Sequence, residues 1–222
     1  QVAGAWISNY NRIVFHAGPE DTLVGTSVVA IVPGPTVISN AGYAAINGKL
    51  RIGGVLTKQG AGVLRLGASN AVSTVEVPVG VLQMVGTGAV GNASLFVTNL
   101  GQVSLHGSAQ AAGTYTNRWF IQGAGPDGSG AVVSSNSAIY GNSSMKHVVL
   151  LGDATFGGTT PTADNGRFDV GYQNGTVTGN HFTLTKTGQN LIVMRGMATN
   201  LQVVINSGAL AAEDFDGALG TN

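Results

Sequence analysis

One passage of the chain returns almost unchanged 128 positions later, and this feature most constrains the fold. The first copy is GVLTKQGAGVLRLG at 54–67, and the second is FTLTKTGQNLIVMRG at 182–196. Both contain Leu-Thr-Lys with a glycine two residues after the lysine. Kept at the same offset, the match continues downstream and places Gly80 on Gly208. A repeat of nearly 40 residues with almost no gaps is typical of chains that stack similar structural units.

Within each copy, apolar and polar residues alternate with a period of two. In TVEVPVG, Val75, Val77 and Val79 share one face of a strand, while Glu76 and Pro78 take the other. SLFVTN and FTLTKTG show the same alternation. These short runs end in Gly, Asn or Ser, which predicts strands and turns. No segment of about a dozen residues has the apolar spacing of an amphipathic helix.

The strand-and-turn unit recurs about every 20 residues, which predicts an all-β chain folded as a right-handed parallel β-helix. Coils of about 20 to 25 residues would give about nine or ten coils with an interior column of Val, Leu and Ile. A β-sandwich is the alternative. We expect a single solenoid domain over residues 1–222. Within it, 1–45 forms a capping or lead-in segment, 46–110 the first repeat block, 111–181 intervening coils and 182–222 the second block.

Composition excludes several classes of protein. Charged residues make up 9% of the chain, and the charges of its ten acidic and ten basic side chains cancel. The net charge therefore gives no electrostatic attraction to nucleic acid or to an anionic membrane. No apolar run reaches the length of a membrane span. Without cysteine there are no disulfides or thiolate metal sites. The chain opens without an initiator Met, as a processed secreted chain does, and we expect a secreted or outer cell-surface location.

The segment LTKQGAGVLRLG resembles the β-strand repeat of autotransporter passenger domains. The typical form, Leu-Thr-Lys-x-Gly-x-Gly-x-Leu-x-Leu, is matched here by Leu56, Thr57, Lys58, Gly60, Gly62, Leu64 and Leu66. The second copy departs from the typical form, because Asn190 aligns with Gly62 and Met194 aligns with Leu66. The resemblance spans about residues 45–222. It implies a β-helical bacterial protein that is secreted or held at the cell surface, and it implies no particular activity.

The sequence contains few candidate catalytic groups. The densest acidic set, EDFD at 213–216, stands before a turn and is interpreted as a solvated loop. The four histidines are scattered without metal-ligand spacing. Asp127 in GPDGSG lies in a turn signature and lacks the further acidic ligands that calcium needs. We therefore expect no catalytic residue, no metal and no cofactor, and the chain is predicted not to be an enzyme.

One segment remains as a candidate ligand site. In ADNGRFD and just after it, Asp164, Arg167, Asp169 and Tyr172 combine acidic, basic and aromatic side chains that could line a saccharide groove. A turn followed by an edge strand explains the same residues equally well.

The favoured function is a non-catalytic extracellular rod that serves as a fibre subunit or adhesin stalk. Its last coil has no obvious polar cap, which predicts either head-to-tail self-association through the solenoid ends or continuation into a longer chain. A polysaccharide-binding module, with surface polysaccharide as partner, is the alternative. A polysaccharide lyase or glycosidase is less favoured, and we expect no nucleic-acid partner.

Overall fold

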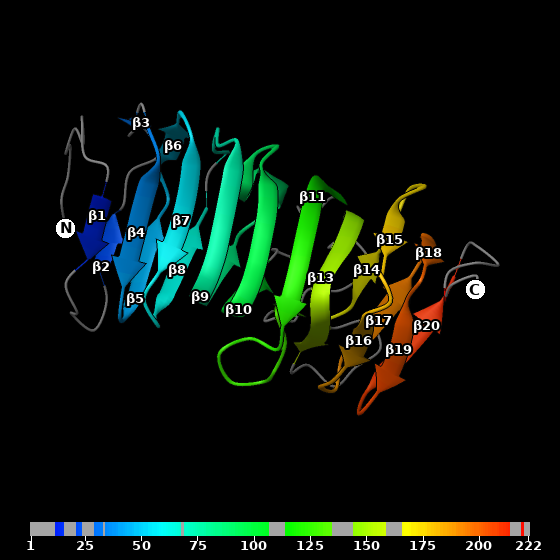
Figure 1. Ribbon diagram of the computed structural model, residues 1–222. Coiled ribbons are helices and arrows are strands. Elements are labelled where there is room, and N and C mark those ends of the chain that lie inside the picture. The colour runs from blue at the N-terminus through cyan, green and yellow to red at the C-terminus, as the bar shows by residue number, and fades with distance from the viewer. Residues whose placement is uncertain are drawn as a thin grey trace.

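The computed structural model describes residues 12–15, 21–23, 29–32, 34–67, 69–106, 114–134, 144–158, 166–213 and 219. These residues form strands with parallel pairings and one short 3₁₀ turn, Thr87–Val90 (Figure 1). The strands are β1 Arg12–Phe15, β2 Asp21–Leu23, β3 Val29–Val32, β4 Thr36–Asn40, β5 Tyr43–Ile46, β6 Lys49–Ile52, β7 Val55–Gln59, β8 Val63–Leu66, β9 Thr74–Met84, β10 Ser94–Leu105, β11 Thr114–Gly123, β12 Val132–Ser134, β13 Ser144–Gly158, β14 Phe168–Val170, β15 Thr176–Thr178, β16 Thr183–Lys186, β17 Leu191–Met194, β18 Met197–Thr199, β19 Gln202–Ile205 and β20 Ala209–Ala212.

The strands stack coil upon coil into a β-solenoid with three faces, and the all-β parallel solenoid prediction is confirmed. Face 1 runs through β4, β7, the start of β9 and β10, β11, the middle of β13, β15 and β18. Face 2 runs through β5, β8, the ends of β9 and β10, β12, the end of β13, β16 and β19. Face 3 contains β3 and β6 near one end and β14, β17 and β20 near the other.

Between β4 and β18 the chain makes about seven turns, slightly fewer than the nine or ten coils expected. The difference has a physical reason in coil length. Residues paired between neighbouring coils are 19 or 20 positions apart near β7. His147 and Thr176, by contrast, lie on neighbouring coils 29 positions apart. Because the middle coils contain more residues each, the same number of residues forms fewer coils.

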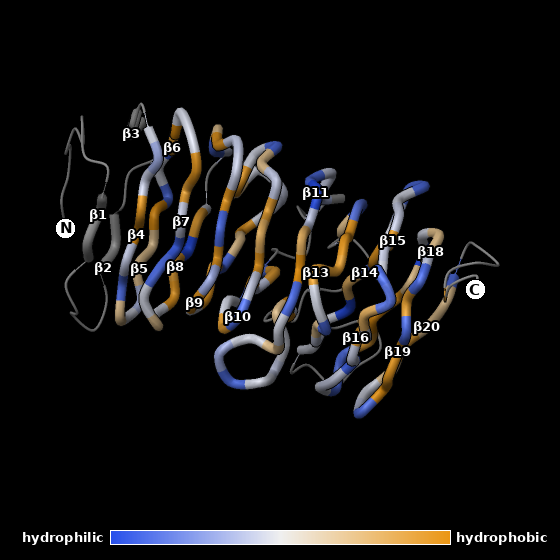
Figure 2. The backbone as a smooth tube through the Cα atoms, in the orientation of Figure 1, coloured by the Kyte–Doolittle hydropathy of each residue, from blue (hydrophilic) through white to orange (hydrophobic). Residues whose placement is uncertain are grey.

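The core is a set of columns inside the solenoid, each with one side chain from every coil. Figure 2 shows apolar residues, in orange, recurring along the strands of successive coils. One column under face 1 contains Thr36, Leu56, Val75, Leu95, Trp119, Val148, Val177 and Ala198, all fully or almost fully buried. Each rung gains its burial only from the rungs above and below, so stability is shared along the rod.

The repeated passage encodes a corner of the solenoid rather than one face. In the first copy, Leu-Thr-Lys lies on β7 in face 1 and the following strand, β8, lies in face 2. In the second copy, Leu-Thr-Lys lies on β16 in face 2 and β17 follows in face 3. The same strand–glycine–strand unit therefore turns two different corners.

A buried lysine closes each of these corners. Lys58 and Lys186 are 0% exposed and point inward, in the same alternation as the leucine two residues before each. The Lys58 ammonium donates hydrogen bonds to the carbonyl oxygens of Gln59 and Gly60, at 2.8 and 2.7 Å. The Lys186 ammonium donates to those of Thr187, Gly188 and Ser207. Desolvation by burial lowers the pKa of each lysine to about 8.

The corner also explains one wrong detail of the sequence interpretation. Val75 and Val77 are buried as expected, but Val79 is only half-buried. The chain turns at Gly80, whose φ is 75°, so Val79 no longer shares the inward face of the two valines before it. A Cβ on Gly80 would collide with the backbone oxygen of Gly60 in the coil below.

Candidate functional site

The described part of ADNGRFD, residues 166–169, lies next to the coil of β17, and the structure brings three of the four predicted residues together. Arg167 and Asp169 form an ion pair, with Arg167 Nε 2.8 Å from Asp169 Oδ1. Tyr172 lies close by, and its ring faces the guanidinium of Arg195 at 4.8 Å. Asp164 lies outside the described residues. Arg195 was not predicted from the sequence as part of the site, and neither was Glu213, which also contacts Arg167.

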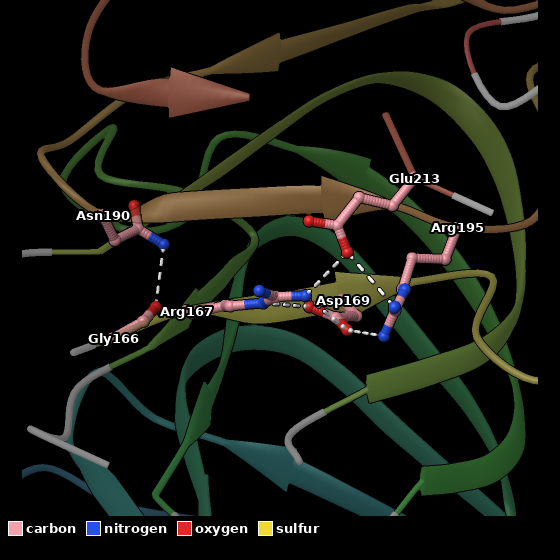
Figure 3. Close-up of polar contacts among 6 residues, drawn as sticks. All are labelled: Gly166, Arg167, Asp169, Asn190, Arg195 and Glu213. Atoms are coloured by element: carbon pink, nitrogen blue, oxygen red, sulfur yellow. Dashed lines mark hydrogen bonds and ion pairs between the residues drawn. The ribbon is translucent and has the colours of Figure 1, made fainter. Parts of the chain in front are cut away.

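Two further charged residues complete a group that we call the charge cluster: Arg167, Asp169, Arg195 and Glu213 (Figure 3). Arg195 Nη1 lies 3.2 Å from Asp169 Oδ2. Both guanidinium groups reach Glu213 Oε2, each at 3.2 Å. Two cations and two anions thus alternate around one small volume, and their formal charges cancel.

The register of face 3 positions these four side chains. Asp169 is the middle residue of β14, Arg195 follows the end of β17, and Glu213 follows the end of β20. Because these strands pair in order, β14 with β17 and β17 with β20, the cluster spans three successive coils. The backbone N–H of Arg195 donates to Val170, and that of Glu213 donates to Met194, which extends each ladder by one hydrogen bond.

Burial dominates the electrostatics of the cluster. The Asp169 side chain is 0% exposed, whereas those of the two arginines are 17% and 20% exposed. Desolvation raises the pKa of the Asp169 carboxyl, and hydrogen bonds from Arg167 and Arg195 oppose that effect. The hydrogen bond to Asp169 in turn raises the pKa of Arg167.

The arrangement of the charge cluster is best suited to a structural role. Each carboxylate of the charge cluster forms ion pairs with both guanidinium groups, and the Asp169 carboxylate is screened from solvent. Charge-assisted hydrogen bonds of this kind hold neighbouring coils in one register. The predicted ligand residues Arg167 and Asp169 are therefore engaged with each other, and the saccharide role assigned to this segment stays a prediction.

The sequence contains a signal for Arg195 and Glu213, the two members of the charge cluster that were not predicted. At the offset of the repeat, Arg195 corresponds to Gly67 and Glu213 to Val85. Val85 and Glu213 make equivalent backbone hydrogen bonds, to Leu66 and Met194. Two stacked positions that are uncharged in one copy and carry opposite charges in the other indicate an ion pair between coils. Interpreting 213–216 as a solvated loop was therefore incomplete for Glu213, while Asp214 and Asp216 lie outside the described residues.

Replacing Asp169 with Asn tests the structural role of the cluster. We expect Asp169→Asn to lower the free energy of unfolding by about 2 kcal/mol, because two partly buried guanidinium groups lose their shared carboxylate. Urea denaturation followed by tryptophan fluorescence measures this loss. Asp153→Asn is the matched control, because Asp153 is exposed and accepts one backbone hydrogen bond that Asn can keep. Equal stability of the two variants would contradict the role.

The other sequence candidates are resolved more simply. Asp127 Oδ1 accepts a hydrogen bond from the backbone N–H of Ser129 at 3.0 Å, so the turn interpretation of GPDGSG is confirmed. Among the residues that the structure describes, no three His, Asp or Glu side chains are grouped to hold a metal ion. The described part of the chain contains no helix long and apolar enough to cross a bilayer.

The last described coil presents a second candidate surface. Within the described residues, β18, β19 and β20 are paired on one side only, by β15, β16 and β17. Ile205 continues the interior column of Phe156 and Lys186 but is 53% exposed, because no described rung covers it. Met197 and Val204 are also exposed, at outward positions of β18 and β19. We call this surface, formed by β18, β19 and β20, the terminal edge.

Comparisons of the chain with family models, with curated proteins and with solved structures gave no match.

Proposed function

We propose that this chain is a non-catalytic structural rod of the autotransporter-repeat type, secreted or held at the cell surface, that extends by stacking end to end. The terminal edge is the observation that carries the proposal. A strand edge with unpaired backbone groups beside exposed apolar side chains favours pairing with a further strand. In a fold whose rungs are stabilised only by their neighbours, another coil is the natural partner.

A second copy of the chain offers strands in the required order. Along the chain β1 pairs onto face 1, β2 onto face 2 and β3 onto face 3. The terminal edge presents β18, β19 and β20 in that same order of faces. Head-to-tail stacking would therefore place parallel strands against parallel strands on all three faces. A contact of this kind joins unlike ends, so it does not close and builds a filament.

The terminal edge can be blocked with one substitution. We expect Ile205→Glu to convert long fibres into single short rods, because stacking would bury an unpaired carboxylate. Negative-stain electron microscopy over a dilution series measures fibre length. Leu100→Glu is the matched control, because Leu100 is 55% exposed on the side of the rod and plays no part in the terminal edge. Short rods of the unaltered chain at every concentration would contradict end-to-end stacking.

A further inference from the structure

Face 1 carries an aromatic ladder that the sequence does not reveal. Phe96 and Phe120 are 24 positions apart in the sequence but are register partners on β10 and β11. Both point outward, because the residues on either side of each are fully buried. Their rings stack with centroids 4.5 Å apart and an interplanar angle of 8°. Val149 pairs with Phe120 on the next coil and continues the row.

A polar row runs beside this ladder, two residues earlier on each strand. Arg118 on β11 is exposed and pairs in register with His147 on β13. His147 Nδ1 lies 3.2 Å from Thr176 Oγ1 on the following coil. Lys146 stands next to His147 at the start of the same strand. Arg118, His147 and Thr176 therefore form a polar row parallel to the apolar one, and Lys146 lies where β13 passes from face 3 to face 1.

The cations of this surface lack a described anionic partner. Arg118 and Lys146 form no ion pair with any residue in the described ranges, unlike the arginines of the charge cluster. One carboxylate, that of Glu76, belongs to a residue that pairs in register with Phe96, and it accepts a hydrogen bond from the Thr57 hydroxyl. In a chain with 9% charged residues, two neighbouring cations without an ion-pair partner among the described residues indicate attraction of a negative group.

We propose that face 1 binds a linear anionic polysaccharide along the rod axis, with carboxylates at Arg118 and Lys146 and sugar C–H groups against Phe96, Phe120 and Val149. The guanidinium fork of Arg118 matches a carboxylate in geometry. Aromatic ring edges carry partial positive charge, so the exposed edges of the two stacked rings also favour an anion. His147 and Thr176 provide hydrogen-bonding groups for hydroxyls in the same row.

The shape of the surface favours a polysaccharide over other anionic polymers. The two rows lie on the flat outer face of a sheet and follow the coil spacing, which suits an extended chain lying across several rungs. A nucleic acid is bound mainly through many cations that contact its phosphates, whereas the described residues of this surface include two, Arg118 and Lys146. An acidic protein would require a larger buried area with its aromatic anchors in pockets.

The test is binding of the full chain to sodium alginate, a linear polyuronate, by affinity electrophoresis, with pullulan as the uncharged polymer. We expect retardation by alginate and none by pullulan. Arg118→Gln should weaken alginate binding about tenfold, because one charge-assisted contact is lost. Arg51→Gln is the matched control, since Arg51 is exposed on β6 in face 3, and it should bind as the unaltered chain does.

A second variant separates binding from folding. Phe120→Thr should weaken alginate binding while circular dichroism keeps the strand signal, because threonine suits an outward strand position. No retardation by alginate would overturn the proposal. Equal weakening by Arg51→Gln and Arg118→Gln would overturn it as well, because it would show attraction to charge alone. Equally tight binding of single-stranded DNA would assign the surface to a nucleic acid instead.

Discussion

The unaltered protein should become more stable as the pH rises from 8 to 10, by about 2 kcal/mol for each buried lysine. The pKa of Lys58 and of Lys186 is about 8 in the folded chain, against 10.5 for an ordinary lysine. Between these values the unfolded chain still holds protons that the folded chain has released. Raising the pH therefore favours folding, and the gain is absent below pH 8.

Urea denaturation at a series of pH values, followed by tryptophan fluorescence, measures this gain. The series ends at pH 10 because desolvation raises the pKa of buried Tyr115 above its ordinary value. Ionisation of that phenol in the unfolded chain would favour unfolding at higher pH. A double variant, Lys58→Met with Lys186→Met, should lose the dependence on pH, while Lys49→Met, at an exposed position of β6, should keep it.

A flat profile for the unaltered chain would contradict the argument from burial. It would mean that the turn carbonyls stabilise the ammonium as well as water does. Those carbonyls belong to Gln59 and Gly60 in one corner and to Thr187, Gly188 and Ser207 in the other. In that case the double variant would still be less stable than the unaltered chain at pH 7, because the same carbonyls would lose their donor.

Gly80→Ala should lower the free energy of unfolding by about 3 to 5 kcal/mol. Part of the loss comes from the backbone, because a φ of 75° costs an alanine about 1 to 2 kcal/mol. The remainder comes from the collision of the new Cβ with the Gly60 carbonyl and from its position 2.7 Å from the Lys58 ammonium. The stacked corner cannot relax without moving the coil below.

Gly128→Ala separates the two contributions. Gly128 has nearly the same φ, 77°, but a Cβ added there meets nothing within 4 Å. We expect this variant to lose about 1 to 2 kcal/mol, the backbone share alone. Denaturation midpoints of the two variants, measured side by side, give the difference. If both lost the same stability, close coil stacking at Gly80 would not be the reason for glycine at this corner.

The fold could be predicted from the sequence because its signals are local and repeated. Alternation in SLFVTN put Leu95 and Val97 inside, and both are fully buried. The number of rungs was harder, because long coils such as the one between His147 and Thr176 leave no local mark. Inward-pointing Lys58 was also missed, since a lysine in an alternating strand is normally assigned to solvent.

The candidate sites depended on register between coils, which the sequence specifies only indirectly. Arg167 and Asp169 were found because they are two residues apart, whereas Glu213 is 46 residues from Arg167. Phe96 and Phe120 are likewise brought together by a coil whose length cannot be counted from the repeat. Aromatic residues scattered along the chain therefore gave no sign of a ladder on one face.

The corner unit has a consequence for how such rods grow in evolution. Since the same passage turns from face 1 to face 2 in one place and from face 2 to face 3 in another, its duplication need not add a whole number of coils. A gene that copies one strand, its lysine and its glycine corner adds a third of a rung and rotates everything downstream by one face. Inward residues of the copied unit remain inward after that rotation, but the residues of the outer surface gain new neighbours. Lengthening by partial rungs is therefore also a way to bring new side chains into line along the same rod.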